Sequence, residues 1–119
     1  MRTIIAGSRD CTDPKVLRRA LSQCGWAPCA VLSGTARGAD TLGEQWAQQF
    51  RVPLEYYPAD WNTHGRGMAG KIRNQAMADA ADALVALWDG NSGGTADMIR
   101  RARAAGLKVF VYKYEDVKL

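Results

Sequence analysis

The sequence contains no long hydrophobic run, and this absence excludes two classes of protein. Its apolar stretches fall far short of the roughly 20 residues that a membrane-spanning helix requires. The uncharged stretch at residues 3–6 is interrupted at once by Gly7, and a signal peptide needs about 7–15 apolar residues there. We therefore expect a protein of the cytoplasm.

Cysteine and histidine are scarce, which limits disulfide and metal chemistry. The three cysteines are an odd number and do not form the framework of a small secreted protein. Cys24 and Cys29, together with the single histidine His64, would supply at most an irregular metal site. We expect reduced thiols, no metal and no cofactor.

The length of the chain predicts one domain, and its charge does not decide whether the partner carries phosphate. A chain of 119 residues can bury one hydrophobic core, so we expect a single domain over residues 1–119. The net charge is +4, and many of the basic residues are arginines. Guanidinium groups match phosphate oxygens two at a time, but a charge this small is explained equally well by solubility.

Short apolar runs alternate with segments of helical periodicity. The runs are rich in β-branched residues and bounded by Gly, Pro or Asp, which is typical of buried parallel strands. Four helices are predicted at about 14–24, 39–50, 68–80 and 95–105. The alternation predicts a three-layer, Rossmann-like α/β sandwich whose five-stranded, mostly parallel sheet has the order 3-2-1-4-5. The predicted strands lie at 3–6, 30–32, 54–57, 83–88 and 109–112.

The segment before the third predicted helix is the least regular part of the chain. Residues 58–70, PADWNTHGRGMAG, read as a polar loop that carries Trp61. The helix that follows aligns Met68, Ile72, Ala76 and Ala80 on one apolar face, and the pattern alone does not separate a core face from a dimer surface.

Glycine-rich loops follow the first, second and fourth predicted strands, at residues 7–9, 34–38 and 90–95. In an open parallel sheet these loops meet at the carboxyl edge, where strand order reverses and ligands bind. Glycine allows close approach of the backbone, and helix N-termini offer free N–H groups to anions. We therefore predict a site for a phosphate- or nucleotide-sized ligand, with hydroxyl groups from Ser8, Thr35 and Thr95 and charge from Arg9 and Arg37.

Several polar residues have two interpretations from spacing alone. Asp40 either stabilises the first turn of a helix or accepts a hydrogen bond from a ribose hydroxyl. Arg73 lies beside Asn74 near the apolar face of the third helix, where an ordinary solvent-facing arginine is expected. Asp60 and His64 form either an acid–base pair or ordinary surface.

Two motifs give the chain a resemblance to a known superfamily. SGTARGAD at 33–40 is similar to the SG-x-ARG-x-D signature of DprA, a protein that binds single-stranded DNA. Arg73-Asn74 with Met77, followed by Ala81-Asp82 and Gly93-Gly94-Thr95, resembles the R-K-x-x-M-x-x-x-A-D … P-G-G-x-G-T-x-x-E pattern of the lonely-guy (LOG) phosphoribohydrolases. Over nearly its whole length the chain resembles the SLOG superfamily, closest to the small YspA-type branch of bacteria and their phages.

The resemblance assigns roles to residues and also shows a departure. It implies that Arg73 is an active-site arginine, that Gly94 and Thr95 bind phosphate, and that helices pair two chains into a homodimer. LOG enzymes carry a catalytic glutamate where this chain has Met98, which cannot transfer a proton. Asp97 is one residue short and would point about 100° away around the helix.

We therefore expect a nucleotide-binding sensor or effector domain with no catalytic residue. The ligand would be a mononucleotide, a cyclic nucleotide or a molecule like ADP-ribose. Two alternatives stay open: hydrolysis of nucleoside monophosphates with a non-standard acid, for which Arg73 and Asp97 would be the catalytic residues, and DprA-like binding of single-stranded nucleic acid. The predicted ligand-binding residues are Gly7, Ser8, Arg9, Gly34, Thr35, Arg37, Gly38, Asp40, Trp61, Arg73, Asn74, Gly93, Gly94 and Thr95.

Overall fold

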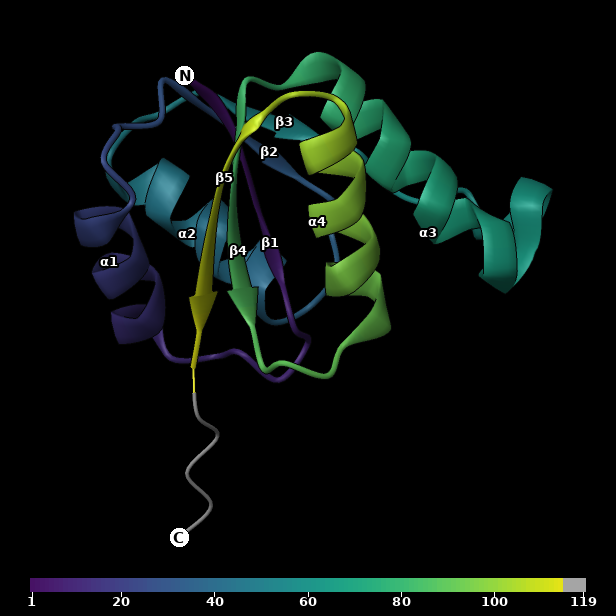
Figure 1. Ribbon diagram of the computed structural model, residues 1–119, viewed down its shortest axis with the longest axis horizontal. Coiled ribbons are helices and arrows are strands. Elements are labelled where there is room, and N and C mark those ends of the chain that lie inside the picture. The colour runs from purple at the N-terminus through teal and green to yellow at the C-terminus, as the bar shows by residue number, and fades with distance from the viewer. Residues whose placement is uncertain (115–119) are drawn as a thin grey trace, which may run out of the picture.

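The computed structural model describes residues 1–114, except for the side chain of Arg66, and shows a sheet between two pairs of helices (Figure 1). The sheet has five strands in the order β3-β2-β1-β4-β5, and every neighbouring pair is parallel. This confirms the predicted Rossmann-like architecture. The elements in chain order are β1 (Arg2–Gly7), α1 (Pro14–Gln23), β2 (Ala30–Ser33), α2 (Ala39–Gln49), β3 (Leu54–Tyr56), α3 (Trp61–Ala80), β4 (Ala83–Trp88), α4 (Gly93–Ala104) and β5 (Lys108–Lys113).

Two hydrophobic cores lie on opposite faces of the sheet. Side chains alternate along a strand, so Ile5 of β1 faces α1 and α2, where it joins Leu17 and Leu42. Ile4 faces the other way, toward α3 and α4, where it joins Met77 and Ile99. Figure 1 shows the same division, with α1 and α2 on one side of the strands and α3 and α4 on the other.

The second helix ends at Gln49, one residue before its predicted end. Leu42 is buried and Trp46 is half-buried. Phe50, in contrast, caps the C-terminus of α2 and is 55% exposed, with its ring centroid 5.3 Å from that of Trp46.

No helix in the described part of the chain is long and apolar enough to cross a membrane.

The prediction of a loop over residues 58–70 is wrong, because α3 already begins at Trp61. The Asp60 carboxylate caps this helix by accepting a hydrogen bond from the Thr63 N–H at 3.1 Å. Gly65, with φ 72° and ψ 175°, then interrupts the helical path, so α3 consists of two helical pieces across a kink. The glycines and polar residues that suggested a loop are accommodated by this kink.

The apolar face of α3 points away from the core at Met68 and Ile72. Met68 and Ile72 are 54% and 42% exposed, whereas Ala69 and Met77 are buried against the sheet. The polar residues at 73 and 74 turn toward the sheet edge. Because Arg73 and Asn74 occupy the side of α3 that faces the cavity, Met68 and Ile72 lie on the side that faces solvent.

Candidate functional site

A cavity of about 430 Å³ lies at the carboxyl ends of β1 and β4, where the order of the strands reverses. The loops after these strands meet there with the loop before α2 and with α3. Eight of the predicted ligand-binding residues line the cavity: Gly7, Ser8, Arg9, Asp40, Arg73, Asn74, Gly94 and Thr95.

The other predicted residues lie outside the lining. Thr35 and Arg37 are exposed on the loop before α2, and Gly34 lies directly beneath Arg73 and Asp40. Trp61 begins α3 and is 46% exposed, and its side chain does not reach the cavity lining. Gly38 packs against the backbone of Arg9, and Gly93 is exposed at the start of α4.

The lining includes residues that the sequence prediction did not count as ligand contacts. Local signals existed for most of them: Asp10 follows Arg9 directly, and Met77 lies one helical turn beyond Arg73. Met77 and Met98 are 1% exposed and give the cavity an apolar floor. The full set of additional lining residues is Ala6, Asp10, Ala36, Met77, Asp89, Ser92 and Met98.

Ser8 joins the loops around the cavity. Its N–H donates to the Leu87 carbonyl at 2.9 Å, and its own carbonyl accepts from the Ala39 N–H at 3.2 Å. Its hydroxyl oxygen accepts from the Asp89 N–H at 3.1 Å. Ser8 is 1% exposed, so its first role is to fix the ends of β1, β4 and α2 relative to one another.

The loop before α2 has a strained backbone. Thr35 has φ 63°, a left-handed conformation that is unfavourable for a β-branched residue. Its N–H donates to the Ser33 hydroxyl at 3.1 Å, and the next N–H, of Ala36, donates to the Asp40 carboxylate at 3.1 Å. Strain of this kind persists only where surrounding contacts enforce it, and it concentrates at functional sites.

Asp40 and Arg73 form the charged wall of the cavity. Asp40 is 5% exposed, and burial raises the pKa of its carboxyl to about 6, although the N–H of Ala36 and the charge of Arg73 oppose this shift. Arg73 donates to the Gly34 carbonyl at 2.5 Å. A β-carbon on Gly34 would lie 2.5 Å from the Arg73 guanidinium and 2.9 Å from the Asp40 carboxylate, so only glycine leaves room for this wall.

Asp97 does not line the cavity, but it supports Arg73 indirectly, through Asn74. Its carboxylate accepts hydrogen bonds from Asn74 at 3.0 Å, from Arg101 at 2.9 Å and from Arg100 at 2.5 Å. Burial opposes ionisation of Asp97, but the bonds from Arg101 and Asn74 outweigh it, and the pKa of the carboxyl is lowered. Asn74 in turn accepts from the Arg73 Nε at 2.9 Å, so Asp97 positions Arg73 through Asn74.

The N-terminus of α4 is open toward solvent. The Ser92 hydroxyl accepts a hydrogen bond from the Thr95 hydroxyl at 3.2 Å but none from a backbone N–H of the helix. β-Carbons on Gly93 and Gly94 would meet no atom within 4 Å. The Asp89 carboxylate orders the preceding loop by accepting from the Ser92 N–H at 2.8 Å. The first turn of α4 therefore presents unobstructed N–H groups beside the cavity, an arrangement that suits an anion.

Within residues 1–114, no three His, Cys, Asp or Glu side chains are placed to hold a metal ion.

The raised pKa of Asp40 predicts a specific pH dependence of stability. Its pKa in the folded state, about 6, exceeds the ordinary aspartate value of 3.8, so the folded protein binds the proton more tightly than the unfolded chain does. The resulting stabilisation is complete below about pH 4 and is lost as the pH rises through about 6, by up to about 3 kcal/mol. Asp40→Asn removes this loss. In urea unfolding, the free energy of unfolding of Asp40→Asn relative to that of the wild type should therefore increase from about pH 4 to about pH 8.

Asp89→Asn is the matched comparison because the pKa of Asp89 is lowered by the N–H groups of Asn91 and Ser92. The stabilisation by Asp89 is complete above about pH 4 and is lost as the pH falls below it, so the stability difference between Asp89→Asn and the wild type should stay constant from about pH 4 to about pH 8. Parallel pH profiles for the two variants would contradict the assigned environment of Asp40.

Comparison with known proteins gives the chain a family. Residues 1–64, more than half of the chain, match the model of the YspA, cpYpsA-related SLOG family. The chain belongs to this family. The SLOG domain is also 38% identical over 117 residues to the Gene 61 protein of Mycobacterium phage D29, an alignment that covers 91% of this chain and 93% of the relative. No solved structure matches the chain. Membership confirms the resemblance to the YspA-type branch of the SLOG superfamily; the matched residues include the motif around Asp40, and the motif around Arg73 lies beyond them.

Proposed function

We propose that this SLOG domain binds a nucleotide or a nucleotide-derived molecule in the cavity and serves as a sensor or effector. The single observation that carries the proposal is the open N-terminus of α4, which shares the cavity with Arg9 and Arg73. Both kinds of group favour phosphate. A cavity of about 430 Å³ also falls within the size range of small-molecule sites.

Different parts of the cavity bind different parts of the ligand. The N–H groups at Gly94 and Thr95 and the guanidinium of Arg9 receive the phosphate. The Asp40 carboxylate accepts hydrogen bonds from ribose hydroxyls and lies next to Arg73. The apolar floor formed by the buried methionines contacts the uncharged part of the ligand.

A second candidate function is hydrolysis of an N-glycosidic bond, and Asp40 is the observation that favours it. Unlike Asp97, Asp40 lines the cavity, and its pKa near 6 allows it to exchange a proton near neutral pH. Incubation with nucleoside 5′-monophosphates and detection of free base tests this function. Release of base that is lost in Asp40→Asn, with ligand binding retained, would establish an enzyme; absence of free base leaves binding alone.

A thermal-shift screen of nucleoside mono-, di- and triphosphates, cyclic nucleotides and ADP-ribose tests the binding proposal. A ligand present at about 100 times its Kd adds about 2.7 kcal/mol to the free energy of unfolding. At least one phosphate-bearing nucleotide should raise the Tm, whereas the matching nucleoside should raise it less. If no compound shifts the Tm, the proposed function is wrong.

A further inference from the structure

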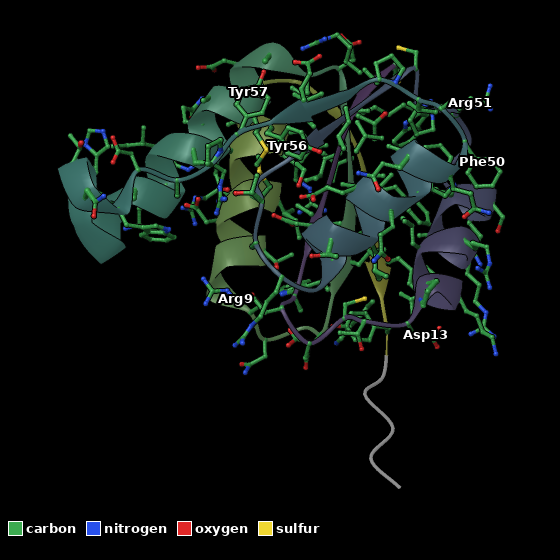
Figure 2. All side chains as sticks on the ribbon, turned by 180° about the vertical axis from the view of Figure 1, so that it is seen from behind. Arg9, Asp13, Phe50, Arg51, Tyr56 and Tyr57 are labelled. Carbon is green, nitrogen blue, oxygen red and sulfur yellow. The ribbon has the colours of Figure 1, made fainter. Side chains whose placement is uncertain are left out.

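A second pocket, of about 260 Å³, lies between the carboxyl end of β3 and the flank of α3. Tyr57 and Pro58 line it from the end of β3, and Ile72, Arg73 and Ala76 line it from α3. Figure 2 shows Tyr57 on the side of the molecule from which α3 projects. The volume lies just below the range of sites that hold a whole small-molecule ligand, so the pocket fits one ring system of a larger molecule.

The pocket adjoins the cavity at Arg73, which lines both of them. The Arg73 guanidinium is held in place because it donates to the Gly34 carbonyl at 2.5 Å and to the Asn74 side chain at 2.9 Å. The strand order places α4 after β4, Asp40 after β2 and the pocket at the end of β3. The groups assigned to phosphate, the group assigned to ribose and the pocket therefore follow one another along the sheet edge, as phosphate, ribose and base do in a nucleotide.

Tyr57 gives the pocket a fixed aromatic surface. Its N–H donates to the Ser33 carbonyl at 2.7 Å, and its hydroxyl donates to the Glu55 carboxylate at 3.2 Å. The same carboxylate accepts two hydrogen bonds from the Arg2 guanidinium, one of them at 2.9 Å. A ring held in this way loses little freedom when a ligand packs against it. Bases stack on aromatic rings and on guanidinium planes, and this pocket offers both, from Tyr57 and Arg73.

We infer that this pocket binds the base of the nucleotide whose phosphate and ribose occupy the cavity. The inference rests on the proposed function and adds the subsite that recognises the base. The base contacts the Tyr57 ring and the Ile72 side chain, and one of its edges points toward Arg73. Ile72 is 42% exposed, and a base that covers it removes apolar surface from water.

Calorimetry with nucleotides and with ribose 5-phosphate measures what the base contributes to affinity. The 5′-monophosphates of adenosine, guanosine, cytidine and uridine are titrated beside ribose 5-phosphate. At least one nucleotide should bind about tenfold or more tightly than ribose 5-phosphate, as expected for a stacked base. Ala76→Phe fills the pocket from an exposed position of α3 and should remove this difference. The affinity of this variant for ribose 5-phosphate should stay within about twofold of the wild type, because the cavity is unchanged.

Met68→Phe is the matched control for Ala76→Phe. Met68 is also exposed on α3 and borders the groove between α3 and α4 together with Ala76, but it does not line the pocket. The same phenyl group at this position should leave both affinities unchanged. Tyr57→Leu removes the ring and should lower nucleotide affinity about tenfold, whereas Tyr57→Phe should retain most of it. Thermal melts show whether each variant is folded.

The outcomes separate this inference from the proposed function. A base contribution that both Ala76→Phe and Tyr57→Leu leave unchanged would overturn the inference, while nucleotide binding in the cavity would stand. Equal affinity of the wild type for ribose 5-phosphate and for every nucleotide would also overturn it, because no base would then be bound. If the wild type binds neither the nucleotides nor ribose 5-phosphate, the proposed function fails and the inference fails with it.

Discussion

Gly7→Ala should lower the free energy of unfolding by about 3 kcal/mol, one of the largest losses expected for any single methyl group in this protein. The added β-carbon would lie 2.0 Å from the Leu87 carbonyl oxygen and 2.9 Å from the β-carbon of Ala39. The neighbouring Ser8 N–H donates to the same Leu87 carbonyl, so β1 cannot move away from β4 without breaking that bond. The clash therefore opens the sheet at the edge of the cavity.

Gly93→Ala is the matched control, because a β-carbon there would meet no atom within 4 Å. Its effect on stability should stay within about 0.5 kcal/mol, which is usual for an exposed position. Urea unfolding followed by circular dichroism measures both variants. Equal stability of the two would show that the C-terminal end of β1 does not pack against β4 as described.

Arg9→Ala should weaken binding of a phosphate-bearing nucleotide about 10- to 100-fold, which corresponds to one charge-assisted hydrogen bond. Arg9 lines the cavity, and its side chain is exposed. Removal of this side chain should therefore leave the fold intact, so the loss of affinity can be attributed to the lost contact between Arg9 and the ligand. Arg73 is a less suitable position for this test, since its guanidinium also holds the Gly34 carbonyl.

Arg37→Ala is the paired control for charge. It removes an exposed arginine from the neighbouring loop, outside the cavity lining, and deletes the same net charge. Its affinity should stay within about threefold of the wild type if the contact is local and not a long-range field. If Arg37→Ala reduces affinity as much as Arg9→Ala, the ligand extends over the loop before α2, as the sequence first suggested.

The sequence determined the fold well because its apolar runs are short and clearly separated by turn residues. Alternating strands and helices leave few topologies, and this fixed both the strand order and the edge at which the cavity lies. The sequence failed at α3, where a capped N-terminus and a kink at Gly65 have the composition of a loop. Periodicity also could not tell the exposed stripe of α3 from a core face, because both are apolar.

The sequence predicted which loops surround the site, but not which of their side chains line it. The glycines identified which segments surround the cavity, but the direction of individual side chains depends on backbone angles and distant contacts. Thr35 adopts a left-handed conformation, and Arg37 is exposed while Arg9 lines the cavity. The role of Asp97 depends on Asn74, 23 residues away on another helix. Neither feature has a local signal in the sequence.

Isothermal titration calorimetry with nucleoside 5′-monophosphates and their matching nucleosides tests the central claim most directly. The account predicts that at least one monophosphate binds with a stoichiometry of one per chain, and that its nucleoside binds at least about tenfold more weakly, because the N-terminus of α4 and Arg9 receive the phosphate. Equal affinity for the nucleotide and its nucleoside, or retention of single-stranded oligonucleotides with no binding of free nucleotides, would contradict it.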